Sequence, residues 1–231
     1  MSLKVLVVED DREIRSMMQS SLSVEGFDVQ TAVSLSEARA LLKHNPPDVI
    51  VLDLGLPDGD GVELVHELRK QHSTPVIVVS ARHQEAQKIA LLDAGADDYL
   101  TKPFSPRELV ARVNTVLRRP RRQAHGTQPA APREFGRLRV DAEGRDVWVD
   151  DQQVGLTRTE FDILDALSAR PNVALSRRQI IDAVWGAGWV GDDHVVDVHV
   201  ANLRKKLDDP PTEPRYILTV RGVGYRMGAG G

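Results

Sequence analysis

The sequence predicts two domains: an α/β domain with a doubly wound parallel (βα)5 sheet, and after it an α+β domain. Short β-branched runs alternate with longer amphipathic segments through the first 118 residues. A stretch rich in proline, alanine and arginine follows, and then come short alternating strands, three helical patterns and a glycine-containing hairpin. We therefore expect domains at 1–119 and 134–231, joined by a flexible linker at 120–133.

The composition excludes several classes of protein. With 0 cysteines, the chain has no disulfides, thiolate metal sites or cysteine nucleophiles. Its first residues lack a signal-peptide pattern, and no apolar run approaches the roughly 18 residues that cross a bilayer, so we expect a cytoplasmic protein without a membrane span. Segments 1–121 and 134–231 each carry a net charge of −3 and the residues between them +2, so charge alone does not indicate nucleic-acid binding.

Five strand-sized runs predict the sheet of the first domain. They are Leu3–Val8, Val29–Ala32, Val49–Leu52, Val76–Ser80 and Tyr99–Thr101. The first, third and fourth runs are apolar at successive positions, as expected of central strands that helices cover on both faces. Capping boxes at Ser34-x-x-Glu37 and Ser105-x-x-Glu108 predict two helix starts, and the second helix should end near Arg118.

The second domain begins with a pattern of short antiparallel strands. Polar and apolar residues alternate over Gly136–Leu156, which predicts an N-terminal antiparallel β platform. Capping boxes at Thr157-x-x-Glu160 and Ser176-x-x-Gln179 open two amphipathic helices, and a third helix is predicted over His194–Leu207. Finally, the glycines of Arg221–Gly224 permit the tight turn of a hairpin.

Polar side chains follow the predicted strands of the first domain at the point where each strand ends. The first strand ends in Glu9-Asp10-Asp11, the third in Asp53 and the fourth in Ser80, and the fifth runs into Lys102. Ligands bind beyond the carboxyl ends of parallel strands, near the topological switch point. We therefore expect a carboxylate cluster for a hard cation, with a hydroxyl and an ammonium beside it. For Asp11, the alternative is a helix N-cap.

These positions lie in motifs that resemble the receiver domain of response regulators. The motifs are Val8–Asp11, Asp53–Gly59, Ser80–Arg82 and Gly95–Phe104. The resemblance implies a flavodoxin-like fold in which Asp53 takes a phosphoryl group from a phosphohistidine of a sensor histidine kinase. It also implies Mg²⁺ bound by Asp10 and Asp53 directly, by Glu9 through water and by the Gly55 carbonyl. Position 55 commonly carries a larger side chain in the family, which leaves the lifetime of the phosphorylated state open.

The resemblance extends to a switch and a dimer face. It implies that Lys102 and Ser80 contact the phosphoryl group, that the Lys102-Pro103 bond is cis, and that Tyr99 rotates inward as the switch. Phosphorylation would then drive a homodimer through the fourth helix, fifth strand and fifth helix. The charged residues placed for this face are Lys88, Asp97, Asp98, Glu108 and Arg112. The alternative for these charges is a solvated helix face.

Residues 135–227 resemble the winged helix-turn-helix effector of the OmpR/PhoB class, most specifically in Thr219–Arg226. Val196, Val200, Leu203 and Leu207 predict the inward stripe of the recognition helix. We assign Asn202, His199 and Asp197 on the outer face to base reading in promoter DNA, and Arg204 and Lys205 to phosphate contacts. Arg221 in the wing should enter the minor groove of this double-stranded DNA. Ala201 and Asn202 stand where some relatives carry arginines, so the operator sequence stays open.

One further loop suggests a protein partner. The loop 186–191 resembles the family's contact with RNA polymerase, in which Trp189 is either an exposed contact or a local anchor. The segment 53–61 also bears a weak likeness to potassium-transport regulators. Together these resemblances predict a phosphorylation-activated transcriptional regulator that binds promoter repeats and is not an enzyme.

Two other classes of function share features with this chain. A haloacid-dehalogenase phosphatase also forms an aspartyl phosphate with Mg²⁺, but it needs a second aspartate two residues after the nucleophile, where this chain has Gly55. Nucleotide-binding glycine motifs are absent from the sequence. A receiver that binds DNA without phosphorylation is the third possibility, but its acidic and lysine positions would be free to decay and all are present here.

Overall fold

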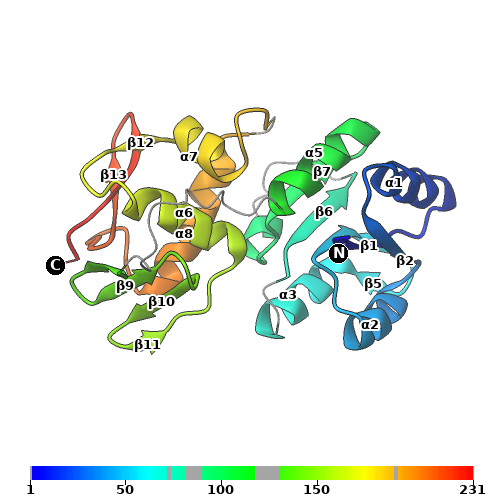
Figure 1. Cartoon of the computed structure of the whole chain (residues 1–231), viewed down its shortest axis with the longest axis horizontal. Coiled ribbons are helices and arrows are strands. Elements are labelled where there is room, and N and C mark those ends of the chain that lie inside the picture. Colours follow the sequence, from blue (N-terminus) through cyan, green and yellow to red (C-terminus); the bar gives the residue numbers. More distant parts are fainter. Residues whose placement is uncertain (1, 72–73, 82–89, 118–130, 190–191, 231) are drawn as a thin grey trace. The chain divides into compact units, whose positions relative to one another are not determined.

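The computed structural model describes residues 2–71, 74–81, 90–117, 131–189 and 192–230, without the side chains of 70 and 71. The chain forms two compact units, Met1–Arg118 and Arg119–Gly231, and each is described by itself (Figure 1). Most of the predicted linker lies outside the described residues, and its last residue, Arg133, already belongs to a strand. Within the described ranges, no helix combines the length and apolarity needed to cross a bilayer.

The N-terminal unit contains a five-stranded parallel sheet in the order β2-β1-β3-β6-β7. The strands are β1 (Lys4–Val8), β2 (Asp28–Ala32), β3 (Val49–Asp53), β6 (Val76–Ser80) and β7 (Asp98–Thr101). This is the doubly wound order of flavodoxin-like folds, so the predicted fold class is confirmed. β3 and β6 are buried at every position, as their unbroken apolar runs indicated.

Helices cover both faces of this sheet. They are α1 (Arg12–Val24), α2 (Leu35–His44), α3 (Gly61–Gln71) and α5 (Pro106–Leu117). Figure 1 shows α1 and α5 on one side of the sheet and α2 and α3 on the other. The predicted fourth helix falls largely on 82–89, outside the described residues. The core between the sheet and the α1/α5 side includes Met18, Leu22, Leu109 and Val113.

The C-terminal unit has the predicted platform, three helices and hairpin. An antiparallel sheet in the order β11-β10-β9-β8 precedes the helices, and a second sheet, β12-β14-β13, contains the hairpin. The strands of the platform are β8 (Arg133–Phe135), β9 (Leu138–Asp141), β10 (Asp146–Val149) and β11 (Gln152–Gln153). The remaining elements are α6 (Arg158–Ser168), β12 (Leu175–Ser176), α7 (Arg177–Val184), α8 (His194–Leu207), β13 (Ile217–Val220) and β14 (Gly224–Met227). We refer to residues 217–227 as the wing.

The four predicted capping boxes are not equivalent. The boxes at Thr157 and Ser176 are complete, with the side-chain and backbone bonds made in both directions. At Ser34, the Glu37 carboxylate accepts from the N–H of Val33 rather than that of Ser34. At Ser105, the Glu108 carboxylate instead pairs with an arginine one turn later in α5. Those two boxes were therefore wrong in their reciprocal half, although each serine hydroxyl still accepts from the backbone N–H of the glutamate three positions later.

Two glycines of the wing are required for different structural reasons. Gly222 has φ +75, a left-handed turn conformation that favours glycine. At Gly224 a Cβ would lie 2.2 Å from the carbonyl oxygen of Leu175, so only glycine lets β12 and β14 pair so closely.

Candidate functional site

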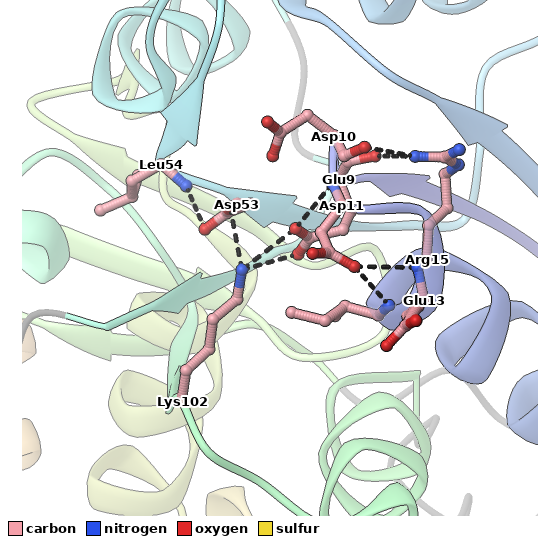
Figure 2. Close-up of polar contacts among 9 residues, drawn as sticks. Glu9, Asp10, Asp11, Glu13, Arg15, Asp53, Leu54 and Lys102 are labelled. Atoms are coloured by element: carbon pink, nitrogen blue, oxygen red, sulfur yellow. Dashed lines mark hydrogen bonds and ion pairs between the residues drawn. The ribbon is translucent and has the colours of Figure 1, made fainter.

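The acidic cluster lies where two neighbouring strands end. β1 pairs with β3; Glu9 and Asp10 directly follow the first of these strands, and Asp53 is the last residue of the second. One ligand oxygen from each of these three residues lies within 4.8 Å of the others (Figure 2). The structure thus brings Asp53 next to Glu9 and Asp10, which precede it by more than forty residues in the sequence. They meet because both strands end at the switch point of the sheet.

Lys102 joins two members of the cluster. Its Nζ lies 3.0 Å from Asp53 Oδ2 and 2.9 Å from Glu9 Oε2, and Figure 2 shows the ammonium between the two carboxylates. The residue follows β7, and its backbone N–H donates to the carbonyl of Ser80 at 2.8 Å. The Lys102-Pro103 bond is cis, as expected.

Burial shapes the protonation of this cluster. Glu9 is fully buried, and desolvation raises the pKa of its carboxyl group, against the opposing effect of the hydrogen bond from Lys102. Desolvation lowers the pKa of Lys102, but its hydrogen bonds to Glu9 and Asp53 outweigh that and leave this pKa raised. The lysine therefore remains a cation, and it stabilises the charged form of Glu9.

The donor set and the charge fit a divalent cation. Three carboxylates and one ammonium leave two negative charges at a site whose metal-ligating atoms are all oxygens. Hard cations such as Mg²⁺ prefer oxygen ligands. The Asp10 side chain is exposed and points away from Lys102 in Figure 2, so the cluster opens to solvent on that side.

Asp11 belongs to the helix rather than to the cluster. Its Oδ1 accepts from the backbone N–H groups of Glu13 and Ile14 at 2.8 and 2.9 Å, and these bonds lower the pKa of the carboxyl group. The N-cap alternative is confirmed. A residue that sequence reasoning missed, Arg15, donates to the carbonyls of Glu9 and Asp10 at 2.8 and 2.9 Å and so holds the acidic loop onto α1.

The loop after Asp53 is a small hairpin. β4 (Gly55–Leu56) pairs with β5 (Gly59–Asp60), and Gly55 is exposed. A Cβ at Gly55 would lie 3.8 Å from Asp53 Oδ2, an ordinary contact distance. Any larger side chain at this position would therefore begin beside the Asp53 carboxylate, whereas glycine leaves that side uncovered.

A second missed residue, Asp58, anchors this hairpin. Its two carboxylate oxygens accept from the backbone N–H groups of Leu35 and Ser36 at 2.8 and 2.9 Å. The turn of the hairpin is thereby tied to the N-terminus of α2. No local pattern indicates this contact, because the partners are 22 and 23 positions away along the chain.

Ser80 and Tyr99 lie on β6 and β7, the two strands that follow β3 in the order of the sheet. Asp53 is the register partner of Val79, so Ser80 stands one residue further along β6 toward the same edge. Tyr99 pairs with Val78 in the register of β7, and its side chain is buried. Ser80 is therefore on the strand next to Asp53, whereas β6 separates Tyr99 on β7 from β3.

Three of the charges predicted to pair across a dimer face, Asp97, Asp98 and Arg112, are buried and paired within the chain. Asp97 accepts from Arg69 and from the backbone N–H of Val76, each at 2.9 Å, and Asp98 receives two bonds of 2.9 Å from Arg112. Both aspartates are fully buried, and Arg112 is 7% exposed. They are buried because each carboxylate has a guanidinium partner within the chain. Of the predicted set, Glu108 is the member whose side chain stays exposed, and Lys88 lies outside the described residues.

In the C-terminal unit, α8 buries more of its surface than its apolar stripe indicates. The predicted inward residues are fully buried: Val196, Val200, Leu203 and Leu207. His199, Asn202 and Arg204, expected on the outer face, are only 1%, 7% and 9% exposed. That expectation was wrong because α8 is covered on two further sides. His199 packs against Trp185, with ring centroids 5.7 Å apart, and Arg204 donates to Ile217 and Thr219 of the wing.

The exposed positions of α8 are fewer. His194, Ala201 and Lys205 recur at helical spacing on one stripe, and Lys206 is exposed beside it, where its ammonium pairs with Glu160. Asp197 is partly exposed and is bonded to residues of α7 and the wing. Arg221 is exposed in the turn of the wing. Trp189 is 6% exposed, with its ring centroid 5.8 Å from that of Trp185, so the local-anchor alternative holds.

Comparison with known protein families divides the chain into the same two parts as the structure does. The family model for the response regulator receiver domain matches residues 5–114, and that for the C-terminal domain of transcriptional regulatory proteins matches residues 151–227. The KDP operon transcriptional regulatory protein KdpE of Escherichia coli (strain K12) is 41% identical over 96% of this chain and 98% of its own. Sensory transduction protein RegX3 of Mycolicibacterium smegmatis is 40% identical over the same shares.

Solved structures agree with these relatives. A mutant of RitR superposes with a TM-score of 0.79 at 27% identity, covering 98% of this chain and 99% of its own. DrrB of Thermotoga maritima, described as an OmpR/PhoB homologue, superposes with a TM-score of 0.52 at 32% identity, covering 99% and 100%. The receiver-type sheet with its acidic edge and the winged helix define a two-component response regulator. The chain belongs to the OmpR/PhoB class of that family, whose members are DNA-binding transcriptional regulators.

We predict that Asp58→Asn destabilises the receiver in a pH-dependent way. Its hydrogen bonds to Ser36 and Leu35 lower the pKa of Asp58 below the ordinary 3.8, so its stabilisation is present above that pH and is lost as the pH falls through the lower folded value. The variant should therefore unfold at lower urea than the unchanged protein at neutral pH, with the difference shrinking below about pH 3.8. Hydrogen-exchange protection of receiver peptides in urea measures this. Asp93→Asn, an exposed charge of the same type, serves as control, and an equal loss in both variants would contradict the anchoring role.

Proposed function

We propose that Asp53 accepts a phosphoryl group from the phosphohistidine of a sensor histidine kinase and that this controls binding of promoter DNA by the effector. The observation that carries the proposal is the convergence of Lys102 with Asp53 and Glu9, at 3.0 and 2.9 Å, beside the exposed Asp10. A receiver and a DNA-binding domain in one chain imply a kinase partner and a DNA target. Because the target is promoter DNA, we expect the protein to act in the cytoplasm.

The transfer requires two anionic groups to approach each other. An Asp53 carboxylate oxygen forms a bond to phosphorus while the bond between phosphorus and the histidine nitrogen breaks, and the histidine leaves with the electron pair. The ammonium of Lys102, already placed at Asp53, screens the repulsion and would contact a phosphoryl oxygen. When bound by Glu9, Asp10, Asp53 and the Gly55 carbonyl, Mg²⁺ would supply further positive charge to the phosphoryl oxygens.

Ser80 and Tyr99 would transmit the change. Ser80 can donate its hydroxyl to a phosphoryl oxygen, and its movement would make room for Tyr99 to pack further inward. This would repack the face formed by the fourth helix, β7 and α5, through which we propose a homodimer forms. Since Asp97, Asp98 and Arg112 are buried, the charge that this set offers to the dimer would come from Glu108, whose side chain stays exposed while it pairs with Arg112, beside the exposed Ala111.

The DNA interface follows from the exposed residues rather than from the whole outer stripe of α8. Lys205 would contact phosphate, and Ala201 would face base edges in the major groove. Arg221 at the exposed tip of the wing would enter the adjacent minor groove. Asn202, His199 and Arg204 would support the helix from within. A contact with RNA polymerase would use the exposed Ala187 and Gly188 of the loop after α7.

The first prediction for this function concerns Asp53. With acetyl phosphate or a cognate kinase and Mg²⁺, the protein should gain one phosphoryl group, and Asp53→Asn should abolish it because the nucleophilic oxygen pair is gone. Phosphate labelling resolved by mass measures the gain. Asp11→Asn changes a neighbouring acid that only caps α1, so it should keep its labelling. Undiminished labelling of Asp53→Asn would show that Asp53 is not the phosphoryl acceptor.

The second prediction concerns the DNA contacts. Lys205→Ala and Arg221→Ala should each weaken binding to all DNA sequences and make the slope of log affinity against log salt shallower by roughly 1. Binding to a fluorescent promoter duplex at several salt concentrations measures both quantities. Lys206→Ala removes the same charge from the same helix, but its ammonium pairs with Glu160 at 2.6 Å, so its salt slope should not change. Unchanged slopes in Lys205→Ala and Arg221→Ala would exclude these two residues from the interface.

A further inference from the structure

One carboxylate in the C-terminal unit connects three elements. Asp197 Oδ1, in the first turn of α8, accepts from Arg177 Nε at 2.8 Å and from the hydroxyl of Tyr225 at 2.7 Å. Arg177 is the first residue of α7, and Tyr225 lies on β14 of the wing. The recognition helix, the helix before it and the wing therefore meet at this oxygen.

A second contact lies two turns further along α8. Arg204 Nη2 donates to the carbonyl of Ile217 at 2.5 Å and to Thr219 Oγ1 at 3.0 Å, both on β13. The guanidinium carbons of Arg177 and Arg204 lie 5.4 and 5.7 Å from the ring centroid of Tyr225. The ring of Tyr225 is thus flanked by two cations, which its negative π-face attracts.

Tyr225 is suited to act as a permanent donor. It is 5% exposed, and burial together with its hydrogen bond to Asp197 raises the pKa of its hydroxyl to about 12. The hydroxyl keeps its proton throughout the physiological range, so the bond to Asp197 does not depend on pH there.

The backbone alone holds the wing weakly. Beyond the pairing of β13 with β14, the hairpin is joined to β12 by two residue pairs, Leu175 with Tyr225 and Ser176 with Gly224. A two-stranded hairpin is marginally stable by itself. Its angle to α8 therefore depends on side chains, and the bonds of Asp197 and Arg204 fix it at two points along the helix.

We propose that Tyr225, Asp197 and Arg204 are positioning residues that hold the wing at a fixed angle to α8, so that Arg221 and Lys205 engage neighbouring grooves of DNA as one preorganised unit. The proposal rests on the DNA interface proposed above. A wing that had to be ordered on binding would lose affinity through the entropy of ordering. Contacts made by the helix and by the wing should accordingly be coupled rather than additive.

The test is a double-mutant cycle in the full-length protein. The probe is a DNA duplex that the unchanged protein selects from a random pool. Tyr225→Phe should weaken binding roughly 3- to 10-fold, about the effect of one lost hydrogen bond, and leave the salt slope unchanged. In its background, the penalty of Arg221→Ala should shrink, because an unanchored wing contributes less. Without DNA, amide exchange over 217–227 should become faster in Tyr225→Phe.

Tyr216→Phe is the matched control. Tyr216 is fully buried, and its hydroxyl has no hydrogen-bond partner among the described residues, so the same atomic change should alter neither DNA affinity nor exchange in the wing. Asp197→Asn keeps an acceptor for Tyr225 and should retain the base preference and most of the affinity of the unchanged protein, whereas Asp197→Ala should reproduce the Tyr225→Phe defect.

The outcomes separate this proposal from the DNA interface on which it rests. If Arg221→Ala weakens binding equally with and without Tyr225→Phe, the wing acts independently and the positioning role is overturned. If Asp197→Asn changes the preferred bases, Asp197 reads DNA directly and the role is likewise overturned. If Arg221→Ala has no effect in either background, the wing does not touch DNA, and the interface itself is refuted together with the proposal.

Discussion

The ion pairs between Lys102 and the carboxylates of Asp53 and Glu9 are the constraint on which the N-terminal unit depends. Carboxylates within a few ångströms of one another, two of them buried, repel strongly unless a cation lies among them. The lysine supplies that charge from a third strand, so β1, β3 and β7 must end together for the cluster to exist. The acidic site therefore depends directly on the parallel order of the strands.

The C-terminal unit uses ion pairs for a different purpose. Here Asp197 and Arg204 connect α8 to the wing, and Glu160 connects the same helix to α6 through Lys206. Much of the polar surface that a helix in the major groove could offer is therefore occupied by its own domain. The contrast explains why an acidic domain can still serve a DNA-binding fold. Several of its carboxylates, Glu160 and Asp197 among them, pair with cations of the same unit, while exposed Lys205 and Arg221 remain on the outer surface.

Sequence reasoning predicted the parts that local patterns encode. The strands of the sheet were located to within one residue, and α8 begins and ends where its pattern indicated, because apolar period and capping are properties of neighbouring residues. The acidic residues were found since strand ends are recognisable and parallel strands share an edge. Asp58 and the burial of Asp98 could not be predicted, because each depends on a partner that only the fold brings near. Arg15 was missed although its partners are near in sequence, because its bonds are to backbone carbonyls, which any sequence presents. The outer face of α8 was wrong for the same reason, since a single apolar stripe does not reveal that a helix is covered on two further sides.

The sparse exposure of α8 has a consequence for how such regulators diverge. Ala201 and Lys205 are exposed on the helix, whereas its neighbouring polar residues hold the domain together. With the DNA interface proposed above, substitutions at the exposed positions would leave the packing intact, so a duplicated copy of this gene could acquire a new set of promoters through a very small number of changes. Substitutions at the internal polar positions would instead disturb every promoter at once. The proposed interface would thus separate the residues free to vary between paralogues from those that all of them must keep.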